Sequence, residues 1–392
     1  MQITGIQVHK VNLPLVTGYR WASGVYFGAT KGIVEVQTDD GIVGWGEVAT
    51  VEQADIVSFE FGPRLIGADP SNIDACHRRC IPEIRTLLNT HDAGLVKAFG
   101  GLELALWDIK GKSLNVPVYS LLGGPVRREI GFSEYFALRV PSATEPGEST
   151  PLEVARYCAR MRAQYGSTVF EGKVGVLDLE AEIEMVKEVR AAIGPDATLR
   201  LDANNSWPLN TARKALKRLE PFDIANIEDP APTFYDMAKL RQHCAIPFSS
   251  HLPDLRLAVE LGVPDTFVLN VMTLGGLRET MKFISACEVM GVGFWFYSGE
   301  SAVGTAAYMQ LAASIPYLSQ PGQSLFRWYA DDVGPDLIQP HANHVPIPDE
   351  PGLGVTVNPQ ALARCQERYE REGVIPQLGQ PGEAVYRQFL QQ

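Results

Sequence analysis

The fold of this chain is decided by the segment Thr198-Leu-Arg-Leu-Asp202-Ala-Asn204, an apolar strand pattern that ends in a carboxylate. Two segments of the same kind follow, Ile224-Ala-Asn-Ile-Glu228-Asp-Pro230 and Ala245-Ile-Pro-Phe-Ser-Ser-His251. The polar residues that close them are 26 and 23 residues apart, about one strand, one helix and two loops. In a barrel of parallel strands such positions converge at the C-terminal face. Two carboxylates and an imidazole brought together there predict a divalent-metal site.

The composition of the 392 residues is that of an ordinary globular protein, with 45% hydrophobic and 20% charged residues. No apolar run reaches the roughly 18 residues of a membrane span, and the first residues lack a signal-peptide pattern. A net charge of −12 argues against nucleic acid and anionic membranes as partners. The six cysteines show no disulfide framework, which favours reduced thiols and a cytoplasmic location.

Hydrophobic patterning divides the chain into three parts. Residues 1–127 read as three antiparallel strands followed by helices, an α+β domain. Residues 128–345 alternate short apolar strands with helices, which predicts parallel βα units, and their number favours a closed barrel over an open sheet. Residues 346–392 hold a Pro-Gly-Leu-Gly turn and a last helix, which we expect to return to the first domain. No glycine-rich dinucleotide or phosphate loop opens any of the predicted barrel helices.

Six short motifs follow one another along nearly the whole chain: Gly101–Lys112 with Pro117–Gly124, Asp202–Asn204, Ile227–Pro230, Thr273–Gly276, Glu300–Thr305 and Pro351–Gly354. In this order they resemble the enolase superfamily, in its mandelate racemase and muconate lactonizing enzyme group. The resemblance implies an α+β capping domain over a modified (β/α)7β TIM-like barrel. It also implies Mg²⁺, a small carboxylate substrate and removal of the proton α to that carboxylate. We further expect a homo-oligomer.

The resemblance implies that Lys173 is the catalytic base. It matches the second lysine of a Lys-x-Lys pair that the family places at the end of its second barrel strand. The first lysine of that pair is replaced by Glu171, which shares a strand face with Lys173. A carboxylate beside Lys173 would favour the charged amine, unless Glu171 is protonated or engaged elsewhere.

The third metal position, usually an acid in the family, is His251. With Asp202 and Glu228 a neutral imidazole leaves two negative charges, which balance a divalent ion. Imidazole also admits Mn²⁺ or Zn²⁺ in place of Mg²⁺. Asp254 is the alternative ligand, but it opens the following helix pattern, where an N-cap role is favoured.

The opposite face of the predicted site lacks the second base that relatives carry. Asn270 and Tyr297 fill those positions; asparagine cannot take a proton, and tyrosine, with a pKa of about 10, would need help. The sequence therefore favours a one-base reaction, either dehydration of a hydroxy (sugar) acid or cycloisomerisation. Two alternatives stay open: a racemase or epimerase with Tyr297 on the second face, and a degenerate member that binds metal or acid without turnover.

Substrate contacts are predicted around this centre. Asn204 lies two residues past Asp202 on the same face, where it contacts a ligand or caps a helix. Glu300 is expected near the opposite face, where it orients substrate or pairs with a lysine. The aromatic and glycine-rich residues 16–28 resemble a family loop that closes over the barrel. That resemblance implies contacts with the distal part of the substrate from Tyr19, Arg20, Trp21 and Tyr26.

Overall fold

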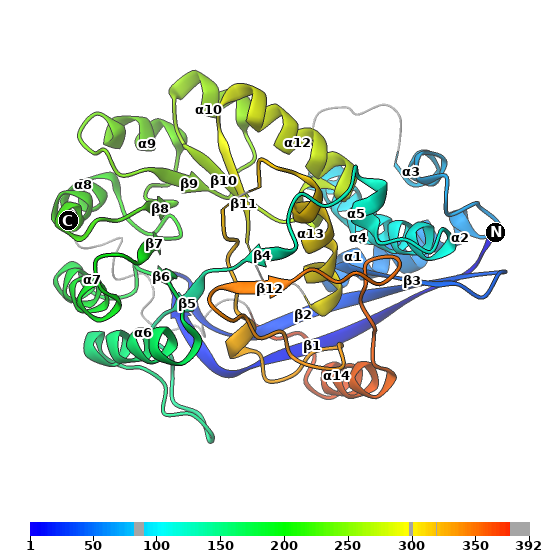
Figure 1. Cartoon of the computed structure of the whole chain (residues 1–392), viewed down its shortest axis with the longest axis horizontal. Coiled ribbons are helices and arrows are strands. Elements are labelled where there is room, and N and C mark those ends of the chain that lie inside the picture. Colours follow the sequence, from blue (N-terminus) through cyan, green and yellow to red (C-terminus); the bar gives the residue numbers. More distant parts are fainter. Residues whose placement is uncertain (82–89, 298–300, 319, 377–392) are drawn as a thin grey trace.

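The N-terminal part of the chain forms a three-stranded antiparallel sheet accompanied by helices (Figure 1). The computed structural model describes residues 1–81, 90–297, 301–318 and 320–376. The strands stand in chain order, β1 (Ile3–Trp21), β2 (Gly24–Thr38) and β3 (Val43–Val48), which confirms the predicted meander. The helices that follow are α1 (Val51–Asp55), the π-helix η1 (Ile56–Phe61), α2 (Gly62–Leu65), α3 (Ile73–Cys80), α4 (Thr90–Ser113) and α5 (Val118–Leu121).

Two glycines of β3 let the long helix α4 lie directly on this sheet. A Cβ atom at Gly44 would come within 2.3 Å of the Ala105 carbonyl oxygen, and one at Gly46 within 2.2 Å of the Gly101 carbonyl oxygen. No side chain fits at such distances, so the two glycines are what allows the close contact between helix and strand.

The larger sheet consists of parallel strands that follow one another in chain order. They are β5 (Glu134–Phe136), β6 (Val169–Lys173), β7 (Thr198–Asp202), β8 (Asn226–Glu228), β9 (Phe248–Ser250), β10 (Thr266–Leu269) and β11 (Gly293–Phe296). Outside them lie α6 (Pro151–Tyr165), α7 (Leu179–Ile193), α8 (Leu209–Leu219), α9 (Phe234–Arg241), α10 (Leu255–Leu261) and α12 (Leu277–Met290), as Figure 1 shows. The predicted alternation of strands and helices is confirmed. Shorter helical pieces are η2 (Glu220–Phe222), α11 (Val271–Leu274) and η3 (Phe326–Trp328), and α13 (Ala302–Ser314) follows β11.

Hydrogen bonds through residues 322–323 join the two edges of this sheet. The backbone N–H of Gln323 donates to the carbonyl oxygen of Phe296 in β11 over 2.8 Å. On the other side, the N–H of Ser133, just before β5, donates to the carbonyl oxygen of Gly322 over 2.7 Å. This short segment therefore takes the place of the eighth strand of a barrel.

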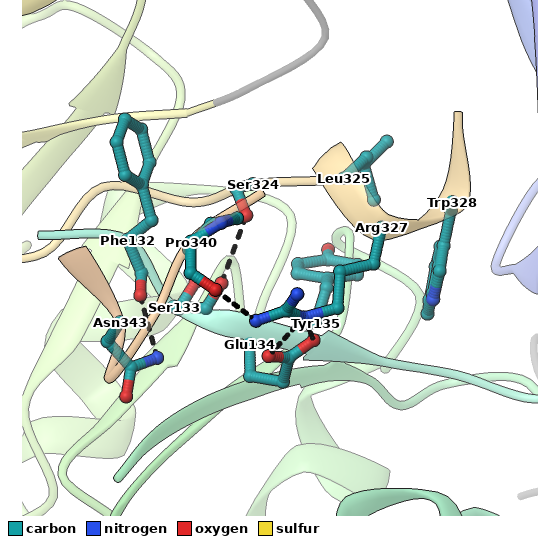
Figure 2. Close-up of a pocket in the computed structure, with 10 residues that line it drawn as sticks. All are labelled: Phe132, Ser133, Glu134, Tyr135, Ser324, Leu325, Arg327, Trp328, Pro340 and Asn343. Atoms are coloured by element: carbon teal, nitrogen blue, oxygen red, sulfur yellow. Dashed lines mark hydrogen bonds and ion pairs between the residues drawn. The ribbon is translucent and has the colours of Figure 1, made fainter. Parts of the chain in front are cut away.

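Arg327 fastens the closing segment to β5. Its Nε lies 2.8 and 3.0 Å from the two carboxylate oxygens of Glu134, and Nη2 donates to the carbonyl oxygen of Pro340 over 2.5 Å. Figure 2 shows the guanidinium held between that carboxylate and that carbonyl. The ring of Tyr165 lies against the guanidinium, 3.5 Å from its centroid. Both charged side chains are buried, so each depends on the other.

The C-terminal segment returns to the N-terminal sheet. Strand β12 (His344–Pro346) pairs antiparallel with β4 (Glu129–Gly131), and α14 (Pro359–Glu372) lies beside β1 (Figure 1). Arg368 of α14 donates to the carbonyl oxygen of Asn12 over 3.0 Å. None of the described helices combines the length and the apolar character that a membrane span requires.

The Arg327–Glu134 pair gives a first prediction. Arg327→Ala leaves the Glu134 carboxylate buried without its partner, and the free energy of unfolding should fall by about 3–5 kcal/mol. Urea unfolding followed by circular dichroism measures this. The matched control is Lys187→Ala, which removes an exposed pair with Glu184 and should leave the midpoint unchanged. Equal midpoints for both variants would show that the buried pair does not stabilise the closure.

Candidate active site

Three potential metal ligands meet at the ends of neighbouring barrel strands. Asp202 ends β7, Glu228 ends β8, and His251 directly follows β9. The strand register aligns Asp202 with Glu228, so the two carboxylates come from adjacent positions. One ligand atom from each of the three residues lies within 4.8 Å of the others. Both carboxylates are fully buried, whereas the imidazole is partly exposed.

The tautomer of His251 points its second nitrogen at Glu228. Nδ1 lies 3.0 Å from the carbonyl oxygen of Val268, which leaves Nε2 2.5 Å from Oε1 of Glu228. Burial disfavours the imidazolium, but the Glu228 carboxylate outweighs it and raises the pKa of His251 to about 10. Burial and the nearby Asp202 raise the pKa of Glu228 to about 8.

These residues fit a divalent cation. A nitrogen lone pair and a carboxylate oxygen at hydrogen-bond distance require a proton or a metal ion between them. Two carboxylates and one imidazole are a donor set that suits Mg²⁺, Mn²⁺ or Zn²⁺. The alternative ligand Asp254 is exposed and caps α10, because its side chain accepts from the N–H of Leu257 over 3.0 Å.

Lys173 lies beside this cluster, at the end of β6. Its Nζ forms an ion pair with Asp202, its neighbour in the strand register. The rings of Tyr135 and Trp21 lie 5.8 and 6.0 Å from the ammonium group. Burial favours the neutral amine, but Asp202 and other nearby groups outweigh it and raise the pKa of Lys173. Any cation that takes up the charge of Asp202 would remove the main cause of this raised pKa.

Glu171 contacts other residues than Lys173. The sequence left this open as one of two ways in which Glu171 would not favour the charged amine of Lys173. Its carboxylate accepts from Ser133 over 3.1 Å and from Gln323 over 2.6 Å, and it lies 3.7 Å from Arg200. Burial raises the pKa of Glu171, and the charge of Arg200 opposes this. The side chain is therefore part of a buried network below the base.

Gln323 is a site residue that the sequence did not reveal. Its Nε2 donates both to Glu171 and to Glu228, so one amide orients a metal-ligand candidate. The segment Gln320-Pro-Gly-Gln323 has the composition of a turn, and no strand pattern marks it. Only the closure of the barrel brings this side chain to the strand ends.

Asn204 supports Asp202 from the same strand end. Its backbone N–H donates to Oδ1 of Asp202 over 2.8 Å, and its Nδ2 donates to Oδ2 over 3.2 Å. The residue has a φ of 46°, in the left-handed region that asparagine tolerates. Its side-chain oxygen is buried without a hydrogen-bond partner among the described residues, which leaves an acceptor for a bound ligand.

A cavity of about 450 Å³ lies over this cluster, within the usual size for a small-molecule site. We call barrel end the polar lining residues that the barrel contributes: Lys173, Asn204, His251, Asn270, Tyr297 and Gln323. We call cap end the non-aromatic lining residues that the N-terminal domain contributes: Lys31, Ala49, Thr50 and Lys97. An aromatic wall of Tyr19, Trp21, Tyr26 and Tyr135 also lines the cavity.

The structure places three of the four predicted cap-loop residues at the cavity. Tyr19 is buried, with its ring centroid 5.4 Å from that of Tyr26, and Trp21 lies near Lys173. Arg20 is a correction: it is exposed and is not among the residues lining the cavity, because side chains alternate along β1. Glu300 lies outside the described residues.

Asn270 and Tyr297 come from strands across the barrel from β6. The side-chain oxygen of Asn270 accepts from the N–H and the hydroxyl of Thr273, each over 2.7 Å, and so caps α11. The ring of Tyr297 packs edge-on against His251, with centroids 5.1 Å apart. Both line the cavity, so the side facing Lys173 offers an amide and a phenol.

The fold and the site agree with comparisons to known proteins. Residues 4–123 match the family described as mandelate racemase / muconate lactonizing enzyme, N-terminal domain, and residues 153–361 match the enolase C-terminal domain-like family. The chain is 26% identical to the N-succinyl-L-Arg/Lys racemase of Bacillus cereus, over 92% of this chain and 97% of the relative. It is 27% identical to the cis-3-hydroxy-L-proline dehydratase of Roseibium aggregatum, over 94% of this chain and 100% of the relative.

Solved structures give the same result. An enolase from Pseudomonas fluorescens, crystallised with bound magnesium, potassium and tartrate, superposes with a TM-score of 0.86. The match covers 95% of this chain and 94% of that one, at 25% sequence identity. Because the family matches span both domains, the chain belongs to the mandelate racemase and muconate lactonizing enzyme group of the enolase superfamily, a group of metal-dependent lyases and isomerases.

Proposed function

We propose that this enzyme removes the proton α to the carboxylate of a small hydroxy acid, with Mg²⁺ as cofactor and Lys173 as its single base. Dehydration is the reaction we favour, and cycloisomerisation is the other one-base outcome. The observation that carries this is the asymmetry of the barrel end: Lys173 ends β6, whereas Asn270 and Tyr297 directly follow β10 and β11, which are distant from β6 in the strand order. Proton transfer on one face is sufficient for either reaction.

Each residue has a distinct part in this proposal. Asp202, Glu228 and His251 would hold the Mg²⁺, which stabilises negative charge that develops on the substrate carboxylate. Neutral Lys173 accepts the α-proton, and its ammonium form then donates a proton to the departing hydroxyl group. Trp21 and the other residues of the aromatic wall limit the access of water to the Lys173 amine.

A racemase or epimerase is the second candidate, and the position of Tyr297 favours it. This phenol lines the cavity across from Lys173, where a second proton donor would be needed. A tyrosine would have to lose its proton far below its usual pKa of about 10 to complete the cycle. A member without turnover has no support in a site that retains both its base and three ligand candidates.

Metal affinity should separate the ligands from the groups that orient them. His251→Ala should lower the affinity for Mn²⁺ by more than about 100-fold, and Gln323→Leu by about 10–100-fold, the usual effect of removing an orienting group. Asp254→Ala is the matched control and should have no effect, because that side chain only caps a helix. Isothermal titration calorimetry measures all three. A loss in Asp254→Ala as large as in His251→Ala would reassign the third ligand.

The base is tested by isotope exchange. Lys173→Ala should slow the exchange of the substrate's α-proton in deuterated water by at least about 10²–10⁴-fold, since it removes the general base. Mn²⁺ binding should persist, because Asp202, Glu228 and His251 remain. Lys214→Ala, an exposed lysine on α8, is the control. Exchange at the wild-type rate in Lys173→Ala would place the base elsewhere.

Stereochemistry distinguishes the two candidate reactions. With Lys173 alone, deuterium should enter the α-carbon of a bound acid with retention of configuration. Tyr297→Phe should then leave the exchange rate within about a factor of ten, because phenylalanine keeps the ring that packs against His251 and a one-base reaction does not use the phenol. Nuclear magnetic resonance and chiral chromatography read out both results. Accumulation of the deuterated opposite enantiomer, stopped by Tyr297→Phe, would establish the racemase instead.

A further inference from the structure

The cavity is lined by basic side chains although the whole chain carries a net charge of −12. Among the described residues, its lining contains Lys31, Lys97, Lys173 and His251 but no aspartate or glutamate. A cleft lined by one sign of charge concentrates ligands of the opposite sign. Such a lining favours a substrate that brings negative charge into the cavity, although Lys31, Lys173 and His251 each also have a carboxylate partner.

The two basic groups of the barrel end already have partners. Lys173 forms an ion pair with Asp202, and His251 lies 2.5 Å from Glu228. Together with a divalent cation, this end is suited to one carboxylate of the substrate. It gives no role to the lysines at the cap end, which belong to β2 and α4 of the other domain.

Lys31 forms an ion pair with Glu47, a carboxylate that also contacts Ser301 of the barrel domain. Its buried Nζ lies 3.5 Å from Oε1 of Glu47, an oxygen that makes no hydrogen bond to any described residue. The other oxygen, Oε2, accepts from the N–H and the hydroxyl of Ser301 over 2.8 and 2.6 Å, at the start of α13. Lys31 is therefore paired in charge with Glu47, but its Nζ donates no hydrogen bond to any described residue.

Lys97 is less constrained still. Its half-buried side chain lines the cavity from α4, and it forms no hydrogen bond or ion pair with the residues that the structure describes. Among the residues that the structure describes at the cap end, two lysines meet a single carboxylate, that of Glu47. A buried or half-buried cation without a partner is costly unless a ligand supplies the counter-charge.

We propose that Lys31 and Lys97 bind a second anionic group at the far end of the substrate. The substrate is then an acid charged at both ends, with its carbon chain along the aromatic wall and its reacting carboxylate at the barrel end. This inference rests on the proposed function, because that function places the first carboxylate. It narrows the substrate class to diacids or phosphorylated acids, and it makes the cap end a selector against acids with a neutral tail.

The test uses acids that share one carbon chain and differ only at the distal carbon. D-gluconate ends in a hydroxyl group, D-glucarate in a carboxylate and 6-phospho-D-gluconate in a phosphate; hexanoate and adipate form a second series without hydroxyls. Calorimetry with the Mg²⁺-loaded full chain should show at least one acid with an anionic group at each end binding about tenfold more tightly than its counterpart with one anionic group. Which of the two anions is preferred identifies the distal group.

The variant to use is Lys97→Met, because Lys97 has no described partner whose loss would disturb the fold. It should abolish the preference for the acid that is anionic at both ends and leave binding of the acid with one anionic group unchanged, and Lys97→Arg should restore the preference. Lys214→Met, on the outer surface of α8, is the matched control. Equal affinity within every series, or a loss in Lys97→Met that is the same for both acids, would overturn the second anion site.

Isotope exchange with the same acids separates this inference from the proposed function. A charge preference that depends on Lys97, without α-proton exchange in any acid, would leave the second anion site standing and refute the proposed reaction. Exchange that depends on Lys173 but does not change in Lys97→Met in any series would support the proposed reaction and refute the second anion site.

Discussion

Two buried carboxylates, Asp202 and Glu228, set the organisation of the site. Neither can reach water, and burial together with the nearby Asp202 raises the pKa of Glu228, so both must be matched by donors or cations. Lys173 forms an ion pair with Asp202. His251 pairs with Glu228, and Gln323 donates a hydrogen bond to it. The arrangement of base, ligands and amide around the barrel end follows from this one requirement.

The residues that close the barrel also complete the site. Gln323 reaches Glu228 only because residues 322–323 lie between β11 and the segment before β5. That segment is anchored a few residues later by the buried pair of Arg327 with Glu134. A loss of packing at this anchor would therefore loosen an amide that orients a metal-ligand candidate, although the anchor itself contains no site residue.

The barrel fold and the residues at strand ends could be predicted because they follow from local periodicity. Asp202, Glu228 and Lys173 each close a strand, and parallel strands bring their ends together. The position of Arg20 could also have been predicted, because side chains alternate along β1 and Arg20 lies between Tyr19 and Trp21, which both line the cavity. Gln323 lies in a segment with no such pattern, and Lys31 and Lys97 lie in a strand and a helix of the other domain. Only packing between distant segments brings all three to the cavity.

Glu47 contacts both the barrel domain, through Ser301, and the cap-end residue Lys31. Its Oε2 accepts hydrogen bonds from Ser301 at the N-terminus of α13, where the helix dipole also favours a carboxylate. Its Oε1 faces Lys31 without a hydrogen bond. The contact of Oε2 with α13 and the ion pair of Oε1 with Lys31 therefore use different oxygens of the same carboxylate. A scaffold built in this way can keep its chemistry at the strand ends while the opposite end of the cavity selects the acid.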